Sequence, residues 1–250
     1  MTEAAPHREV VMEVKDLQKS FGSNKVLDNF NIKLFKGENL VVMGKSGSGK
    51  SVMVKCLVGL LEADSGQITI KDKNIISLGQ ESLDILRTEI GFLFQGSALY
   101  DSMTVKENLE FPLRRHKKRL HIKESNQDLV VEALENVGLV HAIDLMPSEL
   151  SGGMKRRVAL ARALILKPSI IIYDEPTTGL DPITAKEIIA LMNSIQDTYG
   201  TSALIITHDI DCARVVSDRV VLLIDGKNYI EGTFEELAKS SDPKVRAFFK

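Results

Sequence analysis

Residues 44–51 read Gly44-Lys45-Ser46-Gly47-Ser48-Gly49-Lys50-Ser51 and fit G-x-x-x-x-G-K-[ST], the pattern of a phosphate-binding loop. The apolar run 40–43 before it predicts a buried strand, and helix-compatible residues, 51–58, follow it. Glycines let the backbone approach a polyphosphate, and the helix N-terminus adds partial positive charge. In such a loop Lys50 reaches the β- and γ-phosphates and Ser51 ligates Mg²⁺. The alternative, a glycine-rich turn without a ligand, loses weight as further motifs appear downstream.

Length and composition indicate one globular domain, because the chain has 250 residues, of which 44% are hydrophobic and 26% charged. A net charge of −2 gives no reason to expect nucleic-acid binding. Cys56 and Cys212 have no disulfide or metal-ligand pattern, which predicts buried free thiols in a reducing compartment. No apolar run has the length of a membrane helix, and residues 1–8 lack the apolar centre of a signal peptide. We therefore expect a cytoplasmic protein that is able to dock on a membrane partner.

The N-terminal part reads as strands, at 10–14 and, singly or in two pieces, at 25–35, with a turn at 20–24 between them. Phe21 lies in that turn. It is either a packing residue or a platform on which a nucleobase stacks, since aromatic faces stack on bases with little sequence demand. Alone, Phe21 favours the packing role.

The next stretch predicts a turn at 64–66, a strand at 67–70 and a short helix at 82–87. The run 90–94 then predicts a buried strand that ends in Gln95. A polar side chain at the carboxyl end of a strand lies at the rim where α/β sheets bind their ligands. Gln95 is therefore a candidate ligand contact.

Helical patterns dominate the residues that follow, with predicted helices at 104–109, 123–136 and 152–165. Thr104 with Glu107 three residues later predicts a capping box at the first helix start. The dense basic run 114–119 usually belongs to a solvated loop or helix face. Its alternative role is contact with a membrane surface or an acidic partner.

Two further motifs concern anions and a metal. Ser151-Gly152-Gly153 opens the third helix and forms a second potential anion-binding helix start. The buried strand predicted at 170–173 delivers Asp174 and Glu175 at its carboxyl end. Two adjacent acids there are costly to bury unpaired, and a Mg²⁺ ion would supply the missing counter-charge.

The last part predicts a helix at 184–197 and a strand at 203–207 with His208 at its carboxyl end, on the same rim as Gln95 and Glu175. A lone histidine is more often structural, so its position is what makes it a candidate. A hairpin and two short helices complete the predicted elements, at 219–224, 227–231, 234–239 and 243–249.

Together, in this order, the motifs resemble those of the nucleotide-binding subunit of ABC transporters. Residues 44–51 look like the Walker A loop, and Gln95 like the Q-loop glutamine. Residues 150–154 resemble the LSGGQ signature but end in Met154, and residues 170–175 look like Walker B with its catalytic glutamate. The remaining matches are the D-loop, the switch histidine and the adenine-stacking aromatic: Gly179-Leu180-Asp181, His208 and Phe21.

A narrower resemblance joins 92–105, 107–108, 111–113 and 174–184 to the Mla-type ATPases, which energise phospholipid transport between the membranes of double-membraned envelopes. It implies an MlaE-like permease and an Mce-domain protein as partners, at the cytoplasmic face of the inner membrane. Whether a small regulatory subunit also binds stays open, and no nucleic acid is expected. Some members continue beyond the position of Lys250 into a tail that contacts the dimer partner, so the tail contacts are in question here.

The resemblance implies an α/β fold of the P-loop NTPase type within one ABC ATPase domain, 1–250. Its RecA-like core and antiparallel β subdomain would take residues 10–95 and 166–250, and its α-helical subdomain residues 96–165. It also implies a head-to-tail homodimer with two ATP molecules at the interface. The implied catalytic residues are Glu175, His208, Gln95 and Lys50. The implied Mg²⁺ ligands are Ser51, Gln95 and Asp174. The implied ATP contacts are Phe21, residues 44–51, Ser151, Gly152, Gly153 and Asp181, of which the second subunit supplies Ser151 and Gly153.

Three alternatives remain. One is a non-transport ABC ATPase acting on ribosomes or DNA, but such proteins carry tandem ATPase halves or long coiled-coil insertions, and this chain has one signature and no sustained heptads. Another is a non-hydrolysing binding subunit, against which Lys50, Asp174, Glu175 and His208 argue. The third and strongest is the ATPase of an importer or exporter for another solute.

Overall fold

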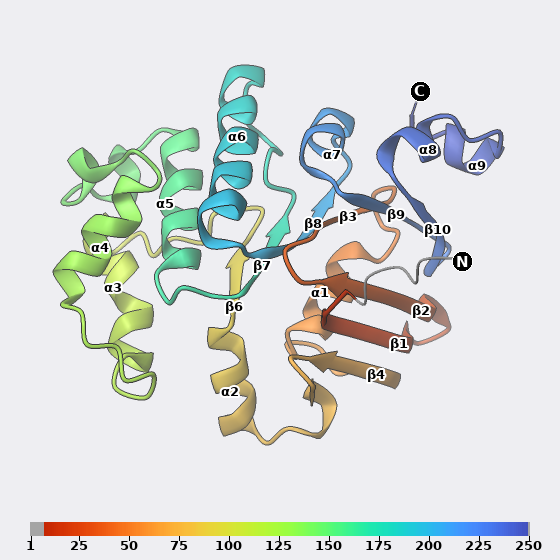
Figure 1. Ribbon diagram of the computed structural model, residues 1–250, viewed down its shortest axis with the longest axis horizontal. Coiled ribbons are helices and arrows are strands. Elements are labelled where there is room, and N and C mark those ends of the chain that lie inside the picture. The colour runs from red at the N-terminus through yellow and green to blue at the C-terminus, as the bar shows by residue number, and fades with distance from the viewer. Residues whose placement is uncertain (1–7, 250) are drawn as a thin grey trace, which may run out of the picture.

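The computed structural model describes residues 8–249 and contains two sheets (Figure 1). The larger has the strand order β10-β9-β3-β8-β7-β6. All neighbouring strands of this sheet pair in parallel, except β10, which is antiparallel to β9. Its strands are β3 (Asn39–Met43), β6 (Ile90–Leu93), β7 (Ile170–Asp174), β8 (Ser202–Thr207), β9 (Arg219–Ile224) and β10 (Lys227–Gly232). Because parallel strands end at one edge, the polar residues after β3, β6, β7 and β8 meet there.

The smaller sheet is antiparallel, with the order β2-β1-β4-β5. Its strands are β1 (Val10–Phe21), β2 (Asn24–Phe35), β4 (Ser65–Ile70) and β5 (Lys73–Asn74). The predicted end of the first strand, at residue 14, is wrong. β1 pairs with β2 as far as Phe21, and register shifts interrupt the alternation between Val14 and Ser20, which concealed the strand in the sequence. Phe21 is thus the last residue of β1, beside a two-residue turn.

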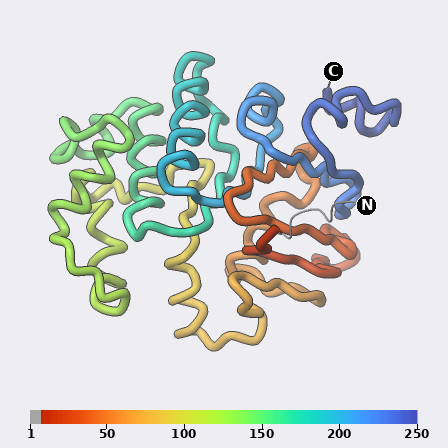
Figure 2. Tube along the Cα trace, in the orientation of Figure 1, coloured from red at the N-terminus to blue at the C-terminus, as the bar shows by residue number. Residues whose placement is uncertain are grey.

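Nine α-helices of the described chain complete the fold: α1 (Lys50–Leu57), α2 (Gln80–Thr88), α3 (Val105–His116), α4 (Asn126–Glu135), α5 (Gly152–Leu164), α6 (Pro182–Tyr199), α7 (Ile210–Val216), α8 (Phe234–Ala238) and α9 (Pro243–Arg246). The chain leaves the larger sheet after β6, runs through α3 and α4, and returns through α5 to β7 (Figure 2). These three helices lie together at one end of the molecule (Figure 1). The predicted fold class, a P-loop NTPase of the ABC ATPase type, is confirmed.

Three apolar clusters stabilise this arrangement. One lies around α1, between the two sheets, and contains residues of β1, β2, β3 and β4. A second lies on the other face of the larger sheet, under α5, α6 and α7. The third joins α3, α4 and α5 to one another, so the helical end has its own core. Cys56 and Cys212 are buried free thiols, as predicted.

Three predicted helix bounds are wrong. α3 continues beyond residue 109 to His116, with Pro112 inside it, since its apolar face packs on α4 and α5. α4 begins at Asn126, because Ser125 caps it, and α9 ends at Arg246. The predicted capping box of Thr104 and Glu107 is present.

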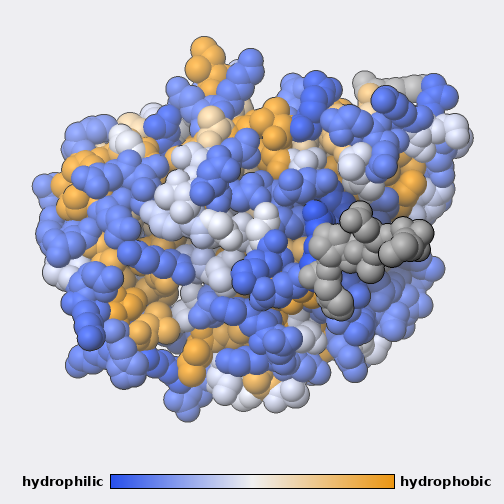
Figure 3. Space-filling view, viewed as in Figure 1, coloured by the Kyte–Doolittle hydropathy of each residue, from blue (hydrophilic) through white to orange (hydrophobic). Residues whose placement is uncertain are grey.

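The basic run 114–119 covers the last turn of α3 and the turns after it. Three of its arginines form ion pairs: Arg114 with Glu110, Arg115 with Asp84 and Arg119 with Glu81. The last two acids belong to α2, so much of this positive charge serves contacts of α2 with the end of α3 and with the turn after it. The face in Figure 3 is mostly hydrophilic, with separate apolar patches. Within residues 8–249, no helix is long and apolar enough to cross a membrane.

Candidate nucleotide site

The phosphate loop connects β3 to α1. Gly47 and Gly49 have φ values of +78° and +103°, which side chains other than that of glycine rarely accept. Gly49 also occupies the N-cap of α1, and no side chain caps this helix. A Cβ atom on Gly44 would collide with Ser48 Oγ, so the loop closes tightly behind its open face. The backbone N–H groups at the start of α1 therefore remain free of side-chain acceptors and suit an anion.

Lys50 is buried at the start of α1. Its Nζ donates to Gly44 O at 2.6 Å and Lys45 O at 3.1 Å, and lies 3.9 Å from Glu175 Oε1. Burial lowers the pKa of Lys50, although Glu175 and Asp174 act in the opposite direction. The ammonium is thus held over the loop, where a phosphate oxygen would gain a charge-assisted hydrogen bond.

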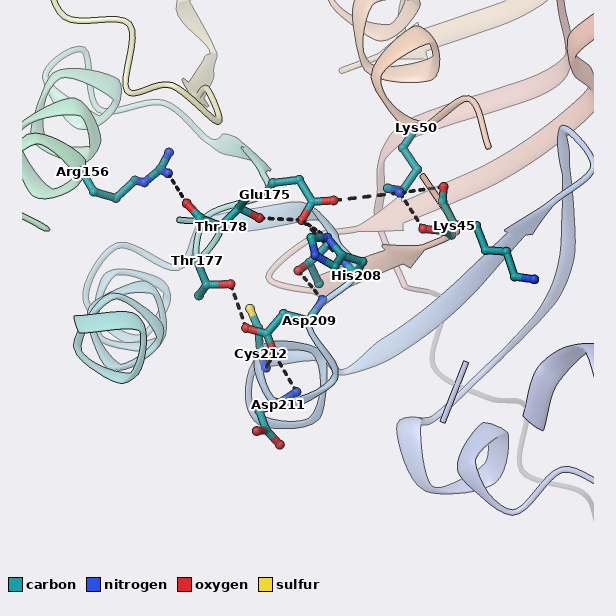
Figure 4. A network of polar contacts seen from close by, with 12 residues as sticks. Lys45, Lys50, Arg156, Glu175, Thr177, Thr178, His208, Asp209, Asp211 and Cys212 are labelled. Atoms are coloured by element: carbon teal, nitrogen blue, oxygen red, sulfur yellow. Dashed lines mark hydrogen bonds and ion pairs between the residues drawn. The ribbon is translucent and has the colours of Figure 1, made fainter. Parts of the chain in front are cut away.

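Glu175 follows β7 directly and is buried, with a left-handed φ of +51°. Its Oε2 atom accepts a hydrogen bond from Thr178 Oγ1 at 3.2 Å and lies 2.8 Å from His208 Nδ1, as Figure 4 shows. Its backbone N–H donates to Ile206 O at 2.8 Å. A strained backbone held by neighbours on both sides fixes the direction of this carboxylate.

Asp174 ends β7 and is half-buried. Burial, and then the charge of Glu175, raise the pKa of its carboxyl, and Lys50 offsets this in part. Two adjacent carboxyls therefore share one nearby ammonium, and a cation bound there would improve the charge balance.

Lys50 and Glu175 border one cavity of about 600 Å³, a volume in the usual range for small-ligand sites, whereas Asp174 is not among the residues that line it. It is lined by Phe21, Val26, Ser46, Gly47, Gly49, Lys50, Ser51, Val52, Gln95, Glu175 and His208. The structure thus brings together most of the predicted site residues from both sheets. Gly44, the first residue of the loop, packs against Ser48. Ser48 and Lys45 line an adjacent cavity of about 480 Å³.

The signature residues lie elsewhere, at exposed helix starts. Ser151 caps α5, and its Oγ accepts from Met154 N at 3.2 Å. Gly152 begins the helix, and Gly153 lies so close to α6 that a Cβ atom would be 2.6 Å from Thr184 Cγ2. Asp181 caps α6 and accepts from the N–H groups of Ile183 and Thr184, both at 3.0 Å. None of the predicted signature or D-loop residues lines the cavity.

Sequence reasoning missed several residues that support the site. Thr178 holds Glu175, and Thr177 Oγ1 donates to Asp209 Oδ2 at 2.8 Å, which ties the segment after β7 to the start of α7. Val26 lines the cavity from β2. The threonines follow the two acids after one proline, Pro176, and this proximity was a usable signal. Val26 has none, because only the pairing of β1 with β2 brings it there.

The geometry defines a P-loop nucleotide-binding ATPase, and comparison with known proteins gives its family. The sequence profile described as "ABC transporter" matches residues 27–178. The chain belongs to the ABC transporter family, as an ATP-binding subunit that hydrolyses ATP. A solved relative, the ATP-binding cassette MJ0796 as a dimer bound to ADP and Pi, superposes with a TM-score of 0.79 at 32% identity, over 89% of this chain and 98% of that one.

Curated relatives refine this placement. The chain is 42% identical to a probable ribonucleotide transport ATP-binding protein, mkl, of Mycobacterium leprae, over 96% of this chain and 68% of that protein. It is 37% identical to the intermembrane phospholipid transport system ATP-binding protein MlaF of Haemophilus influenzae, over 96% of this chain and 90% of that one. It is 38% identical to a methionine import ATP-binding protein, MetN, of Rhizobium johnstonii, over 92% of this chain and 63% of that one. Within the family the chain resembles the Mla-type ATPases.

Proposed function

We propose that this ATPase energises phospholipid transport between the inner and outer membranes of a double-membraned envelope. Its partners would be an MlaE-like permease and an Mce-domain protein, and the permease would hold it at the cytoplasmic face of the inner membrane. The observation that carries the proposal is the likeness to the phospholipid transport ATPase of Haemophilus influenzae, which extends over 90% of that protein. The likeness therefore extends beyond the nucleotide site to almost the whole chain.

We assign the chemical step to Glu175, with Lys50, Gln95 and His208 around it. The Glu175 carboxylate takes a proton from a water molecule as the water oxygen attacks the γ-phosphorus, and the bond to the β-phosphate oxygen breaks to release ADP. His208 at 2.8 Å and Thr178 at 3.2 Å hold Oε2, so the carboxylate has a fixed direction. Lys50 neutralises charge on the β- and γ-phosphates.

The site suits Mg²⁺, and Ser51, Gln95 and Asp174 would be its protein ligands. Ser51 and Gln95 border the cavity, and burial, followed by the charge of Glu175, raises the pKa of the nearby Asp174 carboxyl, which a cation would counteract. Among residues 8–249 no group of three or more His, Cys, Asp or Glu side chains could form a metal cage. This fits Mg²⁺, which commonly takes one or two protein oxygens together with water and substrate phosphates. When bound, the ion neutralises negative charge on the phosphate oxygens.

Two copies of the chain would complete two sites. Ser151, Gly152 and Gly153 of one copy, with its Asp181, would face the phosphate loop of the other. The exposure of the first two residues and Asp181 supports this, because they lie on the surface and away from the cavity of their own chain. A γ-phosphate between two glycine-rich helix starts would join the copies, and hydrolysis would release them.

The permease contact is assigned to residues 92–111, from β6 through the Gln95 loop into α3. The rings of Phe92 and Phe94 pack at a tilt with centroids 4.0 Å apart, and those of Tyr100 and Phe111 do so at 4.8 Å. Phe94, Tyr100 and Phe111 are more than a third exposed. Exposed aromatic clusters of this kind suit a protein partner. The proposal expects a permease helix here, next to the loop of Gln95.

The test is genetic and uses the native cell. Deletion of the gene, and replacement by a Lys50→Ala copy, should both shift phospholipid distribution between the two membranes and raise sensitivity to detergent. A Lys25→Ala copy is the matched control, because Lys25 pairs with Asp28 at the surface. Unchanged lipid asymmetry and an intact barrier in both mutant strains would contradict the proposal.

A second candidate is the ATPase of an importer or exporter for another solute. The likeness to the methionine import ATP-binding protein, at 38% identity, favours it. Loss of uptake of a polar solute in the Lys50→Ala strain, with membrane lipids unchanged, would move the assignment to this candidate. Purification of the native complex, with mass spectrometry of its proteins and bound lipids, discriminates the two directly.

A further inference from the structure

Arg156, on the second turn of α5, is a buried cation with unusual partners. Its side chain is only 4% exposed, and Nη1 donates to Phe94 O at 2.8 Å and Nη2 to Thr178 O at 3.1 Å. Its Nε atom is buried without a partner. Burial alone lowers the pKa of Arg156, because no carboxylate in the described chain compensates it. Burying an unpaired charge costs free energy, so stability alone would favour an apolar side chain here.

Both carbonyl groups belong to segments that carry catalytic side chains. Phe94 directly precedes Gln95, and Thr178 holds Glu175 through its hydroxyl. Figure 4 shows the resulting series of contacts, from Arg156 through Thr178 and Glu175 to His208. One guanidinium thus contacts both the segment that carries Gln95 and the segment that carries Glu175.

A second arginine of α5 holds the far side of the Gln95 loop. Arg162 Nη2 donates to Ser97 O at 3.2 Å. Ser97 and Ala98 have left-handed φ values of +60° and +49°, which are strained for residues with a Cβ. The loop therefore keeps its shape through contacts with α5, the helix that begins at Ser151.

We propose that Arg156 is a positioning residue, which fixes Gln95 and Glu175 of its own subunit to the first turns of α5. The inference rests on the proposed function, in which Ser151 serves the partner's nucleotide. Movement of α5 on nucleotide binding in one composite site would then reach the catalytic residues of the other. The planar guanidinium suits this role because its two terminal nitrogens reach two carbonyls at once. A lysine ammonium is a compact point charge and spans two separate carbonyls less well.

Steady-state kinetics of the full-length protein give the first test. Arg156→Met should lower kcat at least tenfold and change the KM for ATP less than twofold, because Arg156 does not line the cavity. Arg156→Lys should not restore kcat. Arg157→Met is the matched control, since this neighbouring arginine binds Glu187 and Val137 O instead, and it should keep both constants within about twofold. The Tm of Arg156→Met should change little, because removal of the buried charge offsets the loss of its two hydrogen bonds to carbonyl groups. An unchanged kcat, or a loss shared equally with Arg157→Met, would overturn the proposal.

A heterodimer separates positioning from a structural role. With Ser151→Arg in one subunit and Lys50→Ala in the other, one composite site holds both lesions and the second stays intact. In that working site the Ser151→Arg subunit supplies Gln95 and Glu175, and the Lys50→Ala subunit supplies only the signature. Arg156→Met added to the Ser151→Arg subunit should lower activity at least tenfold, and added to the other subunit it should change activity less than twofold.

The opposite pattern, or equal losses in both arrangements, would show that Arg156 only shapes the start of α5, and would overturn the proposal. An inactive parent heterodimer would count against independent composite sites. In that case the role of Arg156 is decided by the homodimer alone, from whether Arg156→Met lowers kcat and leaves KM unchanged.

Discussion

α1 and α5 both begin at glycine-rich turns, yet the two helix starts are built in opposite ways. α1 follows Gly49 in a left-handed conformation and has no side-chain cap, so its first N–H groups remain open to a ligand. α5 follows Ser151, whose hydroxyl already accepts from the N–H of Met154. Lys50 at the first start is buried, whereas Ser151 and Gly152 at the second are exposed.

The difference separates a complete site from half of one. Around α1 the same chain supplies a cavity, a buried ammonium and a fixed carboxylate. Around the start of α5 it supplies a capped, exposed surface with no cavity of its own among the pockets of the described chain. We therefore expect changes near α1 to act within one subunit and changes at the start of α5 to act on the partner.

The largest effect should come from Glu175→Gln. The amide cannot accept a proton from water, and loss of a general base typically costs about 10²- to 10⁴-fold in rate. ATP binding should persist, because Lys50 and the loop are unchanged. The ATP-bound dimer should then accumulate and be visible by size-exclusion chromatography. Near-normal turnover would reject the role of Glu175 as base, and absence of an ATP-dependent dimer would count against the composite site.

Substitution of Ser151 should have a smaller effect, which sharpens the contrast between the helix starts. Asp is a good N-cap, so Ser151→Asp should retain the stability of α5, whereas Ser151→Ala should lose about 1 kcal/mol. The new carboxylate would repel the partner's γ-phosphate, at a cost on the order of 2 kcal/mol, or about 30-fold in ATPase activity.

The measurement compares the Tm and the steady-state ATPase activity of Ser151→Asp and Ser151→Ala. A stable Ser151→Asp protein with full activity would show that no phosphate approaches this helix start. A loss of activity in proportion to the loss of Tm in both variants would indicate a structural role alone.

The sequence predicted the half of the comparison that depends on local patterns. Gly47, Gly49 and Lys50 are neighbours in the chain, so their spacing alone defines a phosphate loop. The rim position of Gln95 and Glu175 followed from buried strands that end in polar residues. The contact of Arg156 with the segments after β6 and β7 had no such signal. It joins residues that are 62 and 22 positions apart, and only the packing of α5 against the sheet brings them together.

Phe21 shows the limit of the same reasoning, because its place in the fold was predicted wrongly, while its role as a platform for a base stays a prediction. Register shifts concealed the second half of β1, so a strand end was read as part of a turn. The side chain, 51% exposed, nevertheless lines the nucleotide cavity. Lys19 Nζ lies over the Phe21 ring, 5.6 Å from its centroid.

The smallest effect should come from Phe21→Ala, which sharpens the comparison at the base end of the cavity. Base stacking on an aromatic is worth about 1–3 kcal/mol, and half-exposure of Phe21 places it at the lower end, so KM for ATP should rise about fivefold. Because the stack is equal in the ground and transition states, kcat should hardly change. Phe21→Tyr keeps the ring and should leave both constants as they are. If kcat falls in Phe21→Ala while KM stays fixed, the ring does not hold the base, and the complete site around α1 must bind adenine through other residues, of which Val26 is the nearest candidate in the cavity wall.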